Sequence, residues 1–110
     1  GTYSGTVNLC RTPAEGDSEE CDNSMAEIEI SENGQVFSDS LFEGLAMTGN
    51  LSGNQFTLSS PFSDPGQDFS GNIKFNGAVI NDSGIAGSIS GTYTEGGVNG
   101  TFSGSFNLSK

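Results

Sequence analysis

Two cysteines enclose the densest group of acidic residues in the chain. The stretch from Cys10 to just beyond Cys21 carries five carboxylates among small polar residues: Glu15, Asp17, Glu19, Glu20 and Asp22. Hard oxygen donors at this density can coordinate Ca²⁺, although their spacing differs from that of an EF-hand loop. A solvated acidic surface that meets a basic patch on another protein needs no ion. We therefore predict a binding loop made of these five residues, without a cofactor or metal, and keep Ca²⁺ as the alternative.

The two cysteines themselves are predicted to form a disulfide. They are the only cysteines, and the sequence contains no histidine, so a four-ligand zinc site lacks ligands. Disulfides persist in oxidising compartments, which predicts a protein of the periplasm, the cell surface or the exterior. Closing the loop between Cys10 and Cys21 is expected to stabilise the fold by roughly 2 to 3 kcal/mol.

Groups suited to catalysis are few. There is no histidine to act as a base, and both thiols are expected in the bridge. Glu27 and Glu29 share a strand face at about 7 Å, a spacing that some glycosidases use, but no aromatic platform or apolar pocket is expected nearby. Lys74 is expected on a solvated strand face. The sequence therefore predicts a protein that is not an enzyme.

The net charge of −11 limits the partners of the chain. It repels phosphate backbones and anionic lipid headgroups, which excludes nucleic acid, and it favours a soluble monomer. No apolar run approaches transmembrane length. The chain opens at Gly1 without a Met or a signal-type apolar segment, which we interpret as the removal of an export signal, with or without a lipid anchor.

Apolar and polar residues alternate through most of the chain, as in Ala26, Ile28 and Ile30 between Glu27 and Glu29. A period of two predicts strands rather than helices. The expected strands lie near residues 2–9, 26–31, 36–40, 45–51, 56–58, 69–75, 85–93 and 98–108.

Turn residues separate these strands. The Asn33-Gly34 pair is typical of a type I′ hairpin. Pro61 and Pro65 interrupt the alternation and predict an exposed loop. Asn76-Gly77 suits a second tight turn or a bulge, and the alternation leaves open whether residues 78–81 pair.

The two ends of the chain have matching sequences, GTYSGTVNL at residues 1–9 and GTFSGSFNL at residues 100–108. We expect the first and last strands to be neighbours, which closes the sheet and removes its edges. Seven glycines share the apolar face: Gly5, Gly49, Gly71, Gly87, Gly91, Gly100 and Gly104. They make room for inward aromatic rings, so a filled interior is expected, with an open lumen as the alternative. The predicted fold is all-β, a single antiparallel up-and-down barrel of about eight strands in one domain, residues 1–110.

Repeated G-[ST]-[YFI]-S-G-[ST] pieces stand at residues 1–6, 87–92 and 100–105, with LSGNQFTL between them. In this periodicity the chain resembles exported bacterial small β-barrel proteins of the lipoprotein type, most of them uncharacterised. It is also similar in architecture to avidins and lipocalins, whose opening strand carries a G-x-W motif. Here Tyr3 stands at the aromatic position and the chain has no Trp, so no binding residue of those families is carried over.

These observations favour a non-catalytic binding domain, secreted or associated with the envelope, whose partner is an unknown protein, glycan or small ligand. Two alternatives stay open. One is a structural or spacer module of a surface protein, and the other is a carrier that holds a small molecule in the barrel lumen.

Overall fold

Eight β-strands make up the regular structure of the chain. The computed structural model describes residues 1–13, 19–41 and 45–110. The strands are β1 (Thr2–Pro13), β2 (Glu20–Ile30), β3 (Gln35–Ser38), β4 (Met47–Asn50), β5 (Gln55–Asp64), β6 (Phe69–Asn81), β7 (Gly84–Glu95) and β8 (Val98–Ser109). In the described ranges, no helix has the length and hydropathy that crossing a membrane requires. The all-β prediction is confirmed.

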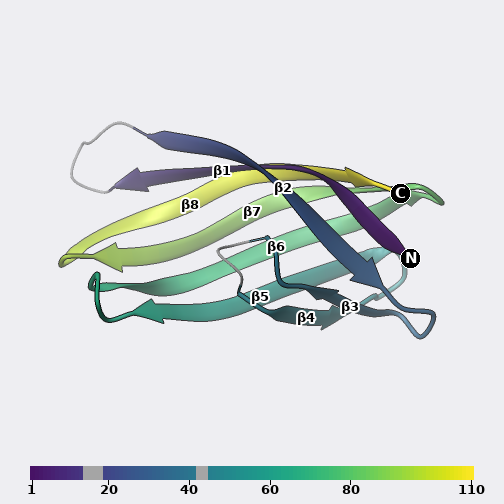
Figure 1. Ribbon diagram of the computed structural model, residues 1–110, viewed down its shortest axis with the longest axis horizontal. Helices are drawn as coiled ribbons and strands as arrows, with labels where there is room; N and C mark the ends of the chain where they lie inside the picture. Colours follow the sequence, from purple (N-terminus) through teal and green to yellow (C-terminus); the bar gives the residue numbers. More distant parts are fainter. Residues whose placement is uncertain (14–18, 42–44) are drawn as a thin grey trace.

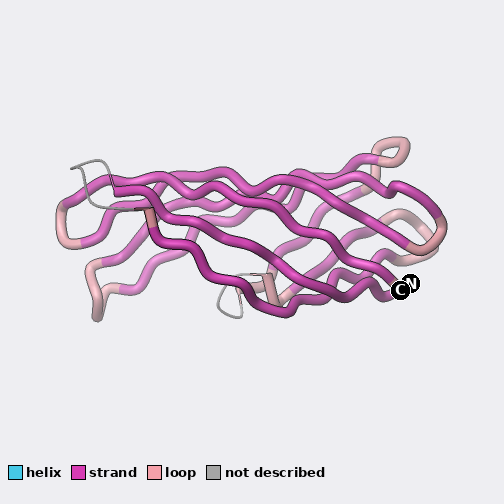
Figure 2. Tube along the Cα trace, turned by 90° about the horizontal axis from the view of Figure 1, so that it is seen from above, coloured by secondary structure: helices cyan, strands magenta, loops and turns pink. Residues whose placement is uncertain are grey.

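The strands form one antiparallel sheet in the order β4-β3-β2-β1-β8-β7-β6-β5. β1 and β8 are neighbours along most of their length, from the pair Ser4 and Ser109 to the pair Pro13 and Gly100. The adjacency expected from the matching end sequences is therefore confirmed. The sheet curls into an elongated body of 42 × 23 × 21 Å (Figures 1 and 2).

The barrel is nearly closed, at a seam between β4 and β5. A bridge between Ser52 and Gln55 joins the chain on the two sides of the seam. At Gly49 the strands approach so closely that a Cβ would overlap the Thr57 carbonyl oxygen. Among the described residues, no continuous ladder pairs β4 with β5. The expected barrel is confirmed, with a seam that is packed rather than fully hydrogen-bonded.

Pro61 does not end β5, contrary to the expected loop at this point. β5 continues to Asp64, and Pro61 pairs with Asn72 of β6. The Val79 N–H donates to the Asn54 carbonyl, so the backbone groups of Asn54 point toward β6. Backbone groups of successive residues point to opposite sides of a strand. Gln55 and every second residue after it therefore point their N–H away from β6. Pro61 is one of these residues. Its missing N–H therefore costs no ladder bond, which is why proline is tolerated on an edge strand.

Two asparagine-glycine pairs behave differently from each other. At Asn33-Gly34 the hairpin is confirmed but not its turn type, because Gly34 has φ +85° while Asn33 keeps a negative φ. The Ser31 N–H donates to the Gln35 carbonyl at 2.9 Å, which closes a three-residue loop with its left-handed residue at Gly34. Asn76-Gly77 is neither a turn nor a bulge, because both residues lie inside β6 and pair with β5 and β7.

Residues 78–81, left open by the sequence, do pair with β7. Ala78 faces Ala86 and Val79 faces Ile85, after which the register shifts before Asn81. Ile80 falls at this irregularity and is 62% exposed. Ile80 has the same parity as the exposed Lys74 and Asn76, so alternation along β6 turns this aliphatic side chain to solvent near the β6–β7 turn.

The inward rows of the strands bury a continuous apolar core. It contains the rings of Tyr3, Phe56, Phe69, Phe75, Tyr93, Phe102 and Phe106 with aliphatic side chains between them. Gly77 and Gly87 face each other across β6 and β7, and the Phe106 ring packs over both. Close packing of large rings on small residues is how the interior of this barrel is filled.

Candidate functional site

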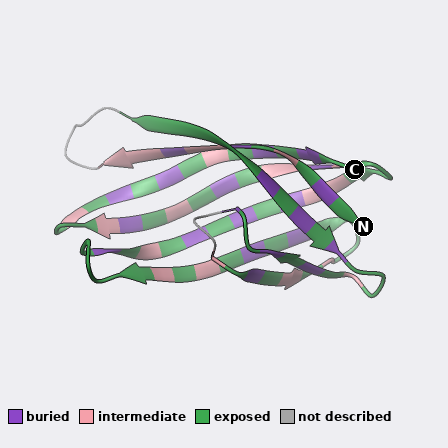
Figure 3. Cartoon of the chain, viewed as in Figure 1, coloured by how far each residue is buried: buried purple, intermediate pink, exposed green. Residues whose placement is uncertain are grey.

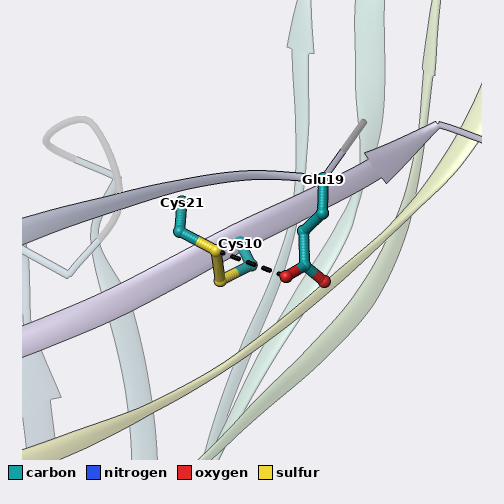
Figure 4. Close-up of side chains that lie close together, drawn as sticks. All are labelled: Cys10, Glu19 and Cys21. Atoms are coloured by element: carbon teal, nitrogen blue, oxygen red, sulfur yellow. Dashed lines mark hydrogen bonds between the residues drawn. A yellow bond between two sulfur atoms is a disulfide. The ribbon is translucent and has the colours of Figure 1, made fainter. Parts of the chain in front are cut away.

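The end of the β1–β2 hairpin carries the residues singled out by the sequence. We call Cys10 to Pro13 of β1 together with Glu19 to Met25 the tethered hairpin. Cys10 and Cys21 lie directly opposite each other with Cα atoms 4.0 Å apart, and they form a disulfide (Figure 4). The predicted bridge is confirmed. It fastens β2 to β1 near the free end of both strands.

The five carboxylates of the predicted binding loop divide into two groups. Glu15 and Asp17 lie outside the described residues. Glu19, Glu20 and Asp22 are described, and all three are exposed. The solvated acidic surface expected from the sequence is therefore present at these three positions.

Contacts of Glu19 tie it to the neighbouring strand. Its Oε2 accepts a hydrogen bond from Thr12 Oγ1 at 3.2 Å, and its Oε1 lies 3.5 Å from Cys21 Sγ (Figure 4). The sulfur of a disulfide has no proton, so the second approach is a contact rather than a donated bond. The Glu19 side chain thus lies against the disulfide and Thr12 of β1.

In the described residues, the sulfurs of Cys10 and Cys21 and a carboxylate oxygen of Glu19 all lie within 4.8 Å of one another. Both sulfurs are in the disulfide, and thiolate is the form of cysteine that binds metals. One carboxylate then remains, whereas Ca²⁺ takes six to eight oxygen ligands. This cluster does not fit a metal. The Ca²⁺ alternative stays a prediction, since it also involves Glu15 and Asp17.

Arg11 is a cation turned toward the interior of the barrel. Its guanidinium carbon lies 5.9 Å from the centroid of the Phe69 ring, and its Nη2 lies 3.7 Å from Glu20 Oε2. The side chains of Arg11 and Glu20 are 38% and 76% exposed, so solvent screens this ion pair. Arg11 offsets one charge of the tethered hairpin and leaves Glu19 and Asp22 without a cation among the described residues.

Residues 20–25 of β2 are exposed on both faces of the strand, whereas the rest of β2 alternates between exposed and buried (Figure 3). The cause is the short β3, which pairs with β2 only at Glu29 and Ile30. Beyond that point β2 has β1 on one side and, within residues 1–13, 19–41 and 45–110, no strand on the other. Sequence reasoning missed this open edge. The signal was the polar character of Glu20, Asp22 and Ser24, which occupy the same parity as the buried Ala26.

Other residues weighed for chemistry lie on the outer surface. Glu27, Glu29 and Lys74 are exposed, and the backbone of Glu27 is held by Ser38 and Ser40. A depression of about 500 Å³ lies over β1, β8 and β7, and it was not predicted from the sequence. Its lining is mainly hydroxyl and amide side chains: Thr12, Pro13, Thr92, Thr94, Asn99, Gly100 and Thr101.

Removing the disulfide is expected to destabilise the chain by roughly 2 to 3 kcal/mol, because the bridge restricts the unfolded chain. Cys10→Ser combined with Cys21→Ser tests this in urea unfolding followed by circular dichroism. Amide exchange should quicken first at the tethered hairpin, with little change in β6 and β7. An unchanged unfolding midpoint would contradict the expected role of the bridge.

The sequence matches no protein-family model and no curated protein. Among solved structures, the chain is similar in fold to a mutant of the vaccine antigen transferrin-binding protein B from Haemophilus parasuis Hp5. The TM-score is 0.55 at 14% sequence identity, and the match covers 100% of this chain and 27% of that one. The chain therefore spans about a quarter of the length of that antigen, and what it shares with the antigen is the fold.

Proposed function

We propose that this chain is a non-catalytic binding domain of the bacterial cell surface or exterior, and that the tethered hairpin is its contact surface. The observation that carries the proposal is the exposure of residues 20–25 on both strand faces. This segment adds little to the core, yet a disulfide holds it in place. A segment that is rigid, charged and free of a packing role is suited to recognition.

Charge supports the same surface. Glu19, Glu20 and Asp22 are exposed there, and of these Glu20 alone has a nearby cation, Arg11. Such a surface attracts cationic groups and speeds encounter with a basic partner. The similarity of fold to a surface antigen named for binding transferrin is in keeping with a binding role and an extracytoplasmic location. The partner proposed for this chain is a basic protein surface, and no cofactor is required.

A carrier function receives less support from the interior. Phe62, Phe69, Tyr93 and Phe102 form a chain of ring contacts with centroids 4.9 to 5.9 Å apart at one end of the barrel. Phe56 and Phe75 pack on Phe106 in the middle of the core, at 6.5 and 6.0 Å. Aromatic rings thus occupy space that a lumen ligand would need.

A pull-down from the envelope fraction of the source organism tests the proposal. Wild type is compared with E20Q/D22N, which neutralises two carboxylates of the tethered hairpin. The matched control, E32Q/D82N, removes the same charge from two turns at the other end of the barrel (Figure 1). We expect the hairpin variant to lose a protein that wild type and control both recover. Identical recovery by all three would contradict the assignment of the surface.

A further inference from the structure

The backbone of β2 has a defined direction at its open edge. The Glu27 N–H donates to Ser40 Oγ at 2.9 Å, and the Glu27 carbonyl accepts from Ser38 Oγ. Both groups of Glu27 therefore point away from β1. Because backbone groups alternate between the two edges of a strand, those of Cys21, Asn23 and Met25 point the same way.

On that side, no strand in the described part of the chain pairs with these three residues. In the described structure, the ladder between β3 and β2 ends at Glu29, and beyond it Ser38 of β3 and Ser40, two residues past the end of β3, bond to Glu27 through their hydroxyls. Among the described residues, no backbone hydrogen bond is formed by Cys21, Asn23 or Met25 on this edge. We call the backbone of Cys21 to Met25 the β2 edge. It presents three N–H donors and three carbonyl acceptors in the place that a longer β3 would fill.

β5, at one end of the strand order, is protected against the addition of a strand, unlike the open part of β2. On β5 the groups that point away from β6 include Pro61, which has no N–H, and Thr57, whose carbonyl is covered by Gly49 of β4. Both features block the addition of a strand. The β2 edge has no proline and no covering strand in the described structure, and the charged side chains of residues 20–25 are the carboxylates of Glu20 and Asp22.

The flanking charges select the partner. Side chains of an added strand would alternate between two faces, beside Glu20 and Asp22 on one face and beside Met25 and Glu27 on the other. Pairing with a second copy of this edge would bring carboxylates against carboxylates, which opposes a homodimer. A strand that carries lysine or arginine meets opposite charge on both faces.

We infer that the β2 edge binds an extended, lysine- or arginine-bearing polypeptide segment as an added strand of the sheet. This inference rests on the proposed function and specifies its partner class. Backbone hydrogen bonds to Cys21, Asn23 and Met25 hold the segment, and the carboxylates set its charge preference. The disulfide keeps the edge extended before binding, which lowers the entropy lost on association.

The first test uses a defined probe and the wild-type protein. The probe is a capped peptide of about ten alternating threonine and lysine residues, which favours an extended chain. A second version has its central amides N-methylated, so it keeps its charges and loses backbone donors. We expect the plain peptide to bind at least about tenfold more tightly in an NMR titration, a difference of about 1.4 kcal/mol. Equal affinity of the two versions would overturn strand addition.

Amide exchange locates the contact residue by residue. In the free protein the N–H groups of Cys21, Asn23 and Met25 should exchange fast, whereas those of Asp22 and Ser24, bonded to β1, should exchange slowly. The plain peptide should slow the first set and leave the second unchanged. Protection that appears on β5 or in the loops, with no change at these three amides, would assign the peptide to another surface.

Protein variants separate the backbone from the side chain. M25P removes an N–H that points away from β1 and so leaves the β1–β2 ladder intact, while M25A removes the side chain and keeps the N–H. We expect M25P to weaken peptide binding about tenfold or more and M25A to change it less than about twofold. Circular dichroism and thermal unfolding verify that both variants fold. Equal effects of the two would count against a backbone contact.

The same variants distinguish this inference from the proposed function. If E20Q/D22N loses its partner in the pull-down while M25P retains it, the binding role stands and strand addition is wrong. If neither variant loses a partner, both proposals fail. If E20Q/D22N and M25P both fail to recover the partner while M25A still recovers it, the result supports binding of the partner as an added strand.

Discussion

Replacing Phe106 by alanine is expected to lower the free energy of unfolding by about 3 to 5 kcal/mol, as for other large buried rings. Phe106 is 3% exposed, and its ring packs between Phe56 and Phe75. The same ring covers Gly77 and Gly87, so its removal leaves an empty volume that glycines cannot fill. Urea unfolding followed by far-ultraviolet circular dichroism measures the loss.

The matched control is Phe37→Ala. Phe37 is the same residue type on β3, but its side chain is 39% exposed, so the loss should stay below about 1 kcal/mol. Similar losses for the two variants would mean that the interior is not packed around Phe106 as the ring contacts indicate.

Gly87→Ala is expected to lower the free energy of unfolding through overpacking. Overpacking typically costs about 1 to 3 kcal/mol, and we expect a loss at or above the upper end of this range because the backbone must move. A Cβ at this position would overlap the Asn76 carbonyl oxygen and would lie 2.7 Å from Gly77 Cα and 2.5 Å from Phe106 Cζ. The β6 backbone lies on one side and a buried ring on the other, so no flexible group can yield. The same denaturant measurement applies.

Gly66→Ala provides the comparison for Gly87. The nearest atom to a Cβ at Gly66 is Asp64 Oδ1 at 3.5 Å, an ordinary contact, and Gly66 has no positive φ. Its replacement should change the stability by less than about 0.5 kcal/mol. If neither Gly87→Ala nor Gly66→Ala changed the free energy of unfolding, β6 and β7 would have to lie further apart than in this structure.

The sequence predicted those features that depend on local alternation. The rows of Ala26, Ile28 and Ile30 in β2 and of Phe102, Phe106 and Leu108 in β8 are buried as expected. Pro61 and Asn76-Gly77 were misjudged for a shared reason. Whether a proline interrupts a strand depends on which edge of the strand its nitrogen faces. Whether an Asn-Gly pair forms a turn depends on whether neighbouring strands pair with it, as β5 and β7 do here. Neither is encoded within a few residues of the site.

The candidate site was predicted in part for a related reason. The disulfide followed from the count of cysteines, and the exposed carboxylates followed from their spacing in a polar loop. The β2 edge could not be predicted, because it exists only where β3 ends before β2 does. β3 ends at the buried Ser38, where its pairing with β4 also ends and where the Ser38 hydroxyl donates to the Glu27 carbonyl.

The pairing of β1 with β8 also affects when the protein can fold. A meander gains its hairpins one at a time, but here the opening strand finds its second neighbour only in the final dozen residues. Joining the two requires closure of nearly the whole chain, a slow and entropically costly step. Until residues 98–109 are free to pair, β1 has β2 as its one strand neighbour among the described residues, and the barrel stays incomplete.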